Sequence, residues 1–334
     1  MKKKKALITG ISGQDGAYLA KLLIKKNYDV IGTSRNPDKL NLWRLRELGI
    51  NKNIKLFKKK ILSSPSFFIK EKLDEIYNLS ASSSVSNSFK HPIKTFKSNT
   101  IDSLQILNSI YLSNKKIKYY QASSSEMYGN TITKCNDKTK FNPLSPYAIS
   151  KLSAHQLTLN YRRNYGLFAC TGILFNHESP LRGKEYVSKK IIRNIIKYKI
   201  SNNHFFELGN IYARRDWGHA EDYVRAMYLM MQNKNADDFI ITSGVNYSIK
   251  DFIDIVCSRL NLKVRWRGLG LNEVLVDQCN NKIIIRINKN LFRPLDIKSS
   301  SGNPIKAKRI LKWKCNKSFI NLIDEMIKYE KKIK

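Results

Sequence analysis

The 334-residue sequence lacks any apolar run of the roughly 20 residues that a membrane-spanning helix requires. The apolar stretch after the basic first five residues is too short for a signal peptide. Cysteines number only five, an odd count without C-x-x-C spacing, which favours reduced thiols in a cytoplasmic protein. Zinc-finger spacing is also missing, and we predict no metal site.

Acidic residues are scarce as well, since 61 lysines and arginines stand against 26 aspartates and glutamates and leave a formal net charge of +35. So basic a chain invites a nucleic-acid hypothesis. The lysines are nevertheless spread over every segment, including Lys25-Lys26 and Lys331-Lys332, and form no basic tail. A general lysine bias therefore explains the charge better than a nucleic-acid surface. We expect neither a specific nucleic acid nor a membrane as partner, and an anionic small substrate would suit this charge.

Alternating strand-like and helix-like patterns predict an α/β fold. Apolar residues make up 42% of the chain, which is typical of a globular protein. The alternation predicts a Rossmann-type, doubly wound parallel sheet with helices on both faces. We expect helices from residue 17 and over residues 95–112, and strands at residues 5–10, 28–34, 54–57, 74–80, 117–123 and 168–175.

The rhythm loosens after residue 186, where we expect a second lobe. Residues 1–186 would form the NADP-binding Rossmann domain with the catalytic residues. Residues 187–334 would mainly form a smaller α/β substrate-binding lobe, and the chain is free to pass back to the first lobe. The elements expected there are helices at 187–199, 219–232, 249–260 and 319–331, and strands at 239–242, 264–268 and 283–287.

The first predicted strand runs into a glycine turn with the spacing G-x-x-G-x-x-G, followed by apolar residues at helical spacing. Such glycines let the backbone approach a pyrophosphate, which then meets the free N–H groups and positive dipole end of a helix. In this context the pattern predicts a dinucleotide site, and the alternative is a tight turn without a ligand. The predicted cofactor-binding residues here are Gly10, Ser12, Gly13, Gln14, Asp15 and Gly16.

The end of the second predicted strand bears on the choice of cofactor. An acidic residue at this position would bind the ribose 2′-hydroxyl of NAD, whereas an arginine suits the 2′-phosphate of NADP. The sequence has no acid there and has Arg35, which favours NADP over NAD. The alternative is a solvated loop arginine, a serious competitor in so basic a chain.

Tyr147 and Lys151 lie four residues apart, just after Ser145-Pro146, which is typical of a capped helix start. The spacing places both side chains on one helical face. An ammonium near a phenol favours the phenolate, so the pair predicts a base that works near neutrality. Ser124 and Glu126 follow the fifth predicted strand and are further candidates. The alternative is an ordinary Tyr–Lys contact on a surface helix.

Five motifs together resemble the GDP-mannose 4,6-dehydratase family, a branch of the extended short-chain dehydrogenases/reductases that binds sugar nucleotides. They are Gly10–Gly16, Ser124–Gly129, Tyr147–Lys151, Asn176–Gly183 and Arg215–Tyr223. The stretches NHESP and RDWGHA are far more specific than the glycine turn. The resemblance covers nearly the whole chain and implies dehydration of GDP-mannose, in a pathway to GDP-fucose or another deoxyhexose.

The resemblance also implies roles for the four candidate catalytic residues. Tyr147, assisted by Lys151, would take the proton of the sugar 4-hydroxyl while hydride passes from C4 to NADP. Ser124 would hydrogen-bond the 4-oxygen. Glu126 would remove the C5 proton and help to expel the 6-hydroxyl as water, after which hydride returns to C6. Related epimerases usually lack a carboxylate at the position of Glu126.

The family's binding residues map onto further positions of this chain. By resemblance, His177 and Arg182 lie near the cofactor. The positions that would line the nucleotide-sugar site are Asn176, Val187, Lys190, Arg215 and Arg293. As alternatives, His177 is an ordinary polar residue at a strand exit and Trp217 only packs.

Departures from the family pattern leave several questions open. Only Arg35 remains of two arginines, the following loop is short, and Lys60-Ile61 and Ser82–Ser84 replace family residues. The choice between NADP and NAD, and the choice between a homodimer and a homotetramer, therefore stay open. The alternatives are an epimerase or dehydratase for a related nucleotide sugar, and a non-catalytic relative with a basic binding surface.

Overall fold

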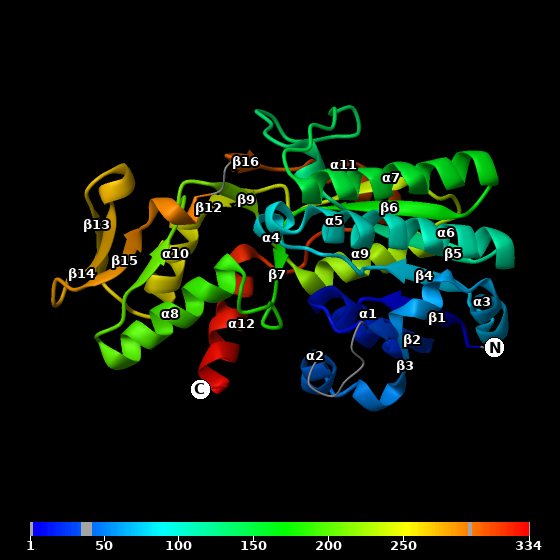
Figure 1. Cartoon of the computed structure of the whole chain (residues 1–334). Coiled ribbons are helices and arrows are strands. Elements are labelled where there is room, and N and C mark those ends of the chain that lie inside the picture. The colour runs from blue at the N-terminus through cyan, green and yellow to red at the C-terminus, as the bar shows by residue number, and fades with distance from the viewer. Residues whose placement is uncertain (1–2, 35–41, 293–295, 334) are drawn as a thin grey trace.

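The computed structural model describes residues 3–34, 42–292 and 296–333. Figure 1 shows two parts, a larger one built around a central sheet and a smaller one that carries the β13–β15 strands. The five cysteines are free thiols. Among the residues described, no helix combines the length and apolarity needed to span a bilayer.

The central sheet has seven strands in the order β11-β6-β5-β4-β1-β2-β3, and every neighbouring pair is parallel. The order reverses between β1 and β4, which makes this the switch point of a doubly wound sheet. The predicted Rossmann-type fold is thereby confirmed. The strands are β1 Lys5–Thr9, β2 Asp29–Ser34, β3 Ile54–Lys58, β4 Glu75–Asn78, β5 Lys118–Ser124, β6 Ala169–Leu174 and β11 Asp238–Ile241.

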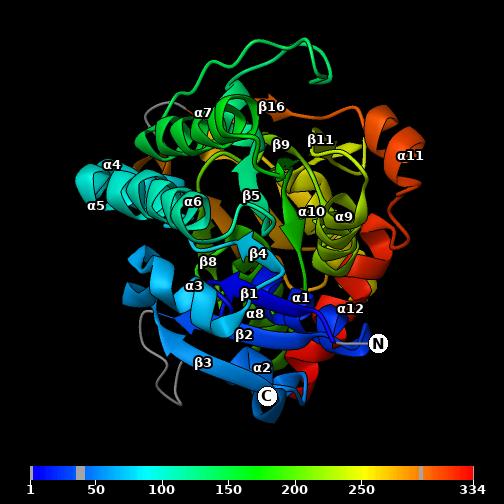
Figure 2. The ribbon, with the colours of Figure 1, turned by 90° about the vertical axis from the view of Figure 1, so that its right-hand side faces the viewer.

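Helices cover both faces of this sheet, as Figure 2 shows. Successive side chains of a strand point to opposite faces, so Leu7 lies in one core and Ile8 in the other. The face of Leu7 carries α3 Pro65–Glu71, α4 Val85–Lys90, α5 Pro92–Phe96, α6 Asp102–Ser113 and α7 Pro146–Tyr165. The other carries α1 Gln14–Lys25, α2 Trp43–Glu47, α9 Ala220–Gln232 and α11 Ile305–Leu311. A π-helical turn, Lys97–Ile101, links α5 to α6.

The smaller part packs helices against a four-stranded sheet. Its strands run in the order β13-β14-β15-β8, and its core includes Ile192, Phe252, Ile285 and Ile323. The strands are β8 Phe206–Leu208, β13 Val264–Arg267, β14 Val274–Asp277 and β15 Ile283–Ile287. The helices are α8 Val187–Ser201, α10 Ile249–Arg259 and α12 Phe319–Lys332.

Short strands connect the two parts. They are β7 His177–Glu178, which pairs with β10 Gly218–His219, and β9 Arg214–Asp216 between β12 Asn246–Ser248 and β16 Ser299–Ser300. The chain also returns to the first sheet, because β11 pairs with β6 and α9 packs on α1. The division at residue 187 stays a prediction.

Local sequence explains the helix that carries the Tyr-x-x-x-Lys motif. The Ser145 hydroxyl accepts a hydrogen bond from the Ala148 N–H at 3.1 Å, and Pro146 occupies the first turn, where its missing N–H costs nothing. Gly166 ends the helix in the left-handed region at a φ of 69°. The predicted helix start at Ser145-Pro146 is confirmed.

Candidate active site

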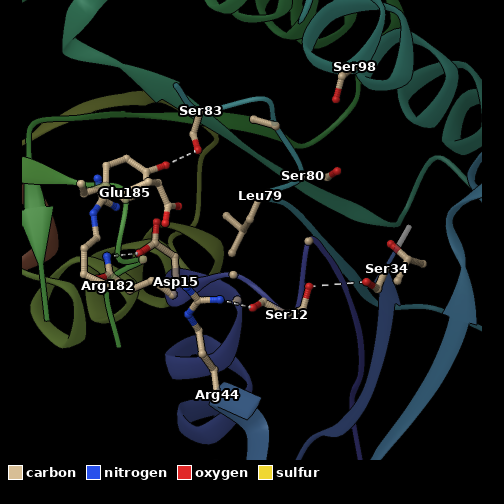
Figure 3. Close-up of a pocket in the computed structure, with 18 residues that line it drawn as sticks. Ser12, Asp15, Ser34, Arg44, Leu79, Ser80, Ser83, Ser98, Arg182 and Glu185 are labelled. Carbon is tan, nitrogen blue, oxygen red and sulfur yellow. Dashed lines mark hydrogen bonds between the residues drawn. The ribbon is translucent and has the colours of Figure 1, made fainter. Parts of the chain in front are cut away.

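A cavity of about 310 Å³ opens at the carboxyl ends of β1, β2 and β4, a volume in the range of small-molecule sites. Ligands of doubly wound sheets bind at this kind of switch point. Figure 3 shows its walls, which come from the glycine turn, from Ser34 at the end of β2, from residues between Leu79 and Ser83 after β4 and from the segment before α8. All six predicted cofactor residues of the glycine turn, and Arg182, line it.

The glycine turn is shaped by close backbone contacts. Gly10 has a φ of +68°, and a Cβ there would lie 2.9 Å from the Ser80 Cα. A Cβ on Gly16 would lie 2.5 Å from the Gly10 carbonyl oxygen. Both positions therefore exclude a side chain.

Gly13 differs from its two neighbours. It is the N-cap of α1, makes no side-chain capping bond, and a Cβ on it would meet only the Gly10 carbonyl oxygen, at 3.2 Å. The start of α1 thus faces the cavity without a side chain in front of it. Bare N–H groups at a helix start bind anions, so the turn fits the diphosphate of a dinucleotide.

Arg182 supplies a positive charge at the cavity wall. Its Nε lies 2.9 Å from the Glu178 carboxylate, and its guanidinium lies 3.6 Å from the centre of the Tyr186 ring. Burial opposes the charge, but Glu178 raises the pKa of Arg182. The Tyr186 hydroxyl is 2.7 Å from the Ser83 hydroxyl, which joins opposite walls of the cavity.

Asp15 and His177 form an ion pair at 2.8 Å between the glycine turn and the exit of β6. Burial disfavours both charges, yet each partner offsets it: the pKa of Asp15 is lowered by His177, and the pKa of His177 is raised by Asp15. The His177 ring also stacks on Tyr223 at 4.4 Å. Asp15 lines the cavity, whereas His177 stands behind it.

Arg44 is a cavity residue that the sequence argument missed. From α2, its Nε donates to the Leu181 carbonyl oxygen at 2.7 Å and its Nη1 to the Ser12 carbonyl oxygen at 2.9 Å. It thereby ties the glycine turn to the segment that carries Arg182. No local pattern distinguishes it among 61 basic residues, because its role depends on contacts between distant segments.

The four candidate catalytic residues gather where β5 meets α7. The Lys151 ammonium is buried, donates to the Ala122 carbonyl oxygen at 3.0 Å and lies 6.0 Å from the centre of the Tyr147 ring. The Tyr147 phenol is hydrogen-bonded to the Ser124 side chain and feels the charges of Glu126 and Arg182. None of the four is a lining residue of the cavity, and the charge of Arg182, which does line it, acts on the Tyr147 phenol.

The electrostatics of this group correct one expectation. Burial raises the pKa of the Tyr147 phenol, and hydrogen bonding to Ser124 offsets this only in part. The prediction that Lys151 lowers the pKa of Tyr147 is wrong for the chain by itself, because the ammonium donates to a backbone carbonyl instead. Burial lowers the pKa of Lys151 to about 8, so its ammonium still predominates at neutral pH.

Of the predicted substrate residues, Asn176 and Arg215 lie in the connection between the two parts, and Val187 and Lys190 lie in α8. Arg215 is buried, with Nη1 donating to the Ile297 carbonyl oxygen at 2.6 Å and Nη2 3.2 Å from Asp296. Lys190 donates to the Glu207 carbonyl oxygen at 2.7 Å. The Asn176 carbonyl accepts from the Gly218 N–H, and Val187 begins α8. Arg35 and Arg293 lie outside the described residues.

The surroundings of Trp217 and His177 bear on the alternative interpretations that the sequence left open. Trp217 packs in the core of the smaller part against Phe252, as its alternative interpretation held. His177 is neither a plain strand-exit residue nor a lining residue, since it pairs with Asp15. None of these contacts was visible in the sequence, because the partners are far apart along the chain.

Comparison with known proteins gives a consistent picture. The model of the family described as GDP-mannose 4,6 dehydratase matches residues 7–326. The chain is 39% identical to GDP-mannose 4,6 dehydratase of Drosophila melanogaster, over 97% of this chain and 85% of the relative. It is 38% identical to GDP-mannose 4,6-dehydratase of Vibrio cholerae serotype O1, over 98% and 93%.

Solved structures share the fold at lower identity. A UDP-glucose 4-epimerase of Thermotoga maritima, solved with UDP-glucose, has a TM-score of 0.82 at 20% identity and covers 98% of this chain and 99% of its own. A dTDP-glucose 4,6-dehydratase of Bacillus anthracis, in complex with NAD, has a TM-score of 0.80 at 19% identity, covering 98% and 97%.

Two of the three glycines of the turn provide a matched test of the cavity. Gly16→Ala places a Cβ against backbone atoms and should cost ~1–3 kcal/mol of unfolding free energy. Gly13→Ala keeps an extended φ of −73° and should leave stability nearly unchanged, while its methyl group weakens dinucleotide binding by roughly tenfold or more. Thermal unfolding and titration with NADP and NAD measure both. Wild-type affinity in Gly13→Ala would place the diphosphate elsewhere.

Proposed function

The chain belongs to the GDP-mannose 4,6-dehydratase family, and we propose that it converts GDP-mannose to GDP-4-dehydro-6-deoxymannose. The observation that carries this proposal is the grouping of Ser124, Glu126, Tyr147 and Lys151, with the charge of Arg182 from the wall of the glycine-turn cavity acting on the Tyr147 phenol. A nicotinamide, when bound, would supply the redox chemistry by taking hydride from C4 of the sugar and returning it to C6, so no external reductant would be consumed.

Tyr147 serves as the base for the sugar 4-hydroxyl. Its phenol is buried, which disfavours the phenolate, so deprotonation depends on positive charge nearby. Lys151 lies one turn after Tyr147 on the same face of α7. Its ammonium donates a hydrogen bond to the Ala122 carbonyl oxygen. Ser124, hydrogen-bonded to the phenol, is positioned to donate to the 4-oxygen. The proton of the 4-hydroxyl thus passes to Tyr147.

Glu126 carries the elimination step. The 4-keto group acidifies the C5 proton, which the Glu126 carboxylate removes, and the resulting acid protonates the departing 6-hydroxyl. One water is thereby eliminated across C5 and C6, and Glu126 returns to its carboxylate form. Glu126 lies two residues beyond Ser124 and close enough to Tyr147 to raise the pKa of the phenol. Related epimerases usually lack this carboxylate, which favours dehydration over epimerisation.

The cofactor is a nicotinamide dinucleotide, and we favour NADP over NAD. The cavity wall supports this choice, since Ser34 ends β2 without an acid that would bind a ribose 2′-hydroxyl. The residues that would hold the dinucleotide are those of the glycine turn with Tyr147, Lys151 and Arg182, with Arg35 next in the chain after Ser34. Asp15, paired with His177, fixes the start of α1.

The substrate is a nucleotide sugar bound between the two parts. Asn176 and Arg215 lie in the connecting segments and Val187 and Lys190 in α8, and Lys190, Arg215 and Arg293 would supply cations suited to a diphosphate. On this view residues 1–186 bind the cofactor and carry the catalytic groups, while residues 187–334 mainly bind substrate. We further propose a cytoplasmic homodimer or homotetramer without a specific nucleic-acid or membrane partner.

Activity should appear with GDP-mannose and catalytic NADP in the absence of reductant. Mass spectrometry should show the loss of one water from the sugar nucleotide, because hydride taken from C4 returns to C6. An unchanged mass across GDP-, UDP-, CDP- and dTDP-hexoses would contradict the proposal. An isomer of unchanged mass, detected by NMR, would favour the epimerase alternative.

Glu126→Gln should separate oxidation from elimination. The amide keeps the size of the side chain but removes the base, so deuterium uptake at C5 should slow by about 10²–10⁴-fold. Transient NADPH absorbance should remain, because Tyr147 and Lys151 are intact. As a control, Tyr147→Phe should abolish the NADPH signal too. Wild-type exchange at C5 in Glu126→Gln would remove this residue from the mechanism.

NADP should bind more tightly than NAD by about tenfold, since one charge-assisted contact contributes roughly 1.5–3 kcal/mol and the family's second arginine is missing. Calorimetric titration of both cofactors measures the ratio. Arg35→Ala should abolish the preference, whereas Arg46→Ala, an exposed α2 residue in the same region, should not. Tighter binding of NAD to the wild type would show that Arg35 is only a loop residue.

A further inference from the structure

The segment 176–183 lies between β6 and α8 and carries Arg182, which lines the cavity. Side chains of α1, α2 and α8 form hydrogen bonds with this segment. The Ser179 hydroxyl donates to the Gln14 side chain of α1 at 2.7 Å. The Leu181 carbonyl accepts from Arg44 of α2, as described above. The Pro180 carbonyl accepts from the Lys189 ammonium of α8 at 2.6 Å. Three consecutive residues of this segment are therefore each fixed by a different distant group.

The third of these contacts depends on the C-terminal helix. Lys189 is only 2% exposed, and its Nζ lies 2.5 Å from Oε1 of Glu330, which is 1% exposed. The same ammonium lies 4.6 Å from the centre of the Tyr329 ring. Arg193 stands 3.4 Å from the other Glu330 oxygen. Figure 1 shows α8 and α12 side by side.

A buried cation of this kind requires its acid. Burial lowers the pKa of Lys189, Arg44 and Arg193 lower it further, and Glu330 counteracts them. Without Glu330, Lys189 would be a buried ammonium among other cations, which is unfavourable unless it loses its proton or moves. Either response weakens its bond to the Pro180 carbonyl. Pro180 is two residues from Arg182, so the disturbance reaches the cavity wall directly.

We propose that Glu330 and Lys189 are positioning residues that couple the C-terminal helix to cofactor affinity. Glu330 holds the Lys189 ammonium, Lys189 holds the Pro180 carbonyl, and the 176–183 segment then presents the Arg182 guanidinium to the anionic dinucleotide. Neither residue touches the cofactor. The inference rests on the proposed function only in taking the cavity as the dinucleotide site.

The test measures NADP affinity by calorimetry in parallel with thermal unfolding. Glu330→Gln keeps the size of the side chain and removes its charge, and should weaken NADP binding roughly 5- to 50-fold, the usual range of coupling between sites. Lys189→Met should have a similar effect. The double variant should bind NADP no more weakly than the single variant with the larger loss of affinity, because both changes act through the same carbonyl. Lys189→Arg, which can reach both partners, should largely restore the affinity.

A matched control is available in the smaller part. Glu273 is also 1% exposed, pairs with Lys250 at 2.6 Å and accepts a hydrogen bond from the Tyr212 hydroxyl. Glu273→Gln should lower the melting temperature about as much as Glu330→Gln and leave NADP affinity within about twofold of wild type. This comparison separates a loss of stability from a loss of positioning.

Two results would overturn the inference. One is an NADP affinity unchanged in both Glu330→Gln and Lys189→Met, and the other is an equal loss of affinity in Glu273→Gln. If Glu330→Gln fails to fold, Lys189→Met and its comparison with Lys189→Arg decide by themselves. Turnover plays no part in the measurement, so an inactive chain with normal NADP binding contradicts the proposed dehydratase function alone.

Discussion

Close contact between the glycine turn and the backbone after β4 fixes the arrangement of the site. The Cβ that Gly10 lacks would lie 2.9 Å from the Ser80 Cα, and the one that Gly16 lacks would lie 2.5 Å from the Gly10 carbonyl oxygen. These are backbone atoms at the ends of central strands, so no rotamer change relieves the contact. The start of α1 is therefore held at the switch point of the sheet, and the loops that line the cavity pack onto this turn.

Acidic residues, although scarce, are paired with buried cations in and around the cavity. Arg182 is paired with Glu178, His177 with Asp15, and Lys189 with Glu330. An unpaired buried charge is strongly unfavourable, whereas a pair with further hydrogen bonds is tolerated. The cavity wall thus carries Arg44 and Arg182 together with Asp15, whereas Glu178 and Glu330 lie outside its lining. This arrangement suits an anionic dinucleotide, and the overall charge of +35 does not reveal it.

The candidate catalytic group is formed by one helix and the end of one strand. The Tyr147 and Lys151 side chains share a face of α7 because of their spacing, and the Ala122 carbonyl near the end of β5 anchors the ammonium. Burial then makes the phenol harder to ionise, and Ser124 compensates in part. Deprotonation of the Tyr147 phenol therefore depends on positive charge close to it.

The sequence by itself determined the alternation of strands and helices, the glycine turn, the capped start of α7 and the group Ser124, Glu126, Tyr147 and Lys151. These depend on local spacing, on backbone sterics and on motifs that lie within a few residues of one another. Tertiary structure alone decided the role of Arg44, the partners of His177, the direction of the Tyr147 pKa and the link from Glu330 to Pro180. Each of these depends on which distant groups are buried together, and a side chain's charge and hydrogen bonds then follow from its neighbours in space rather than from its neighbours along the chain.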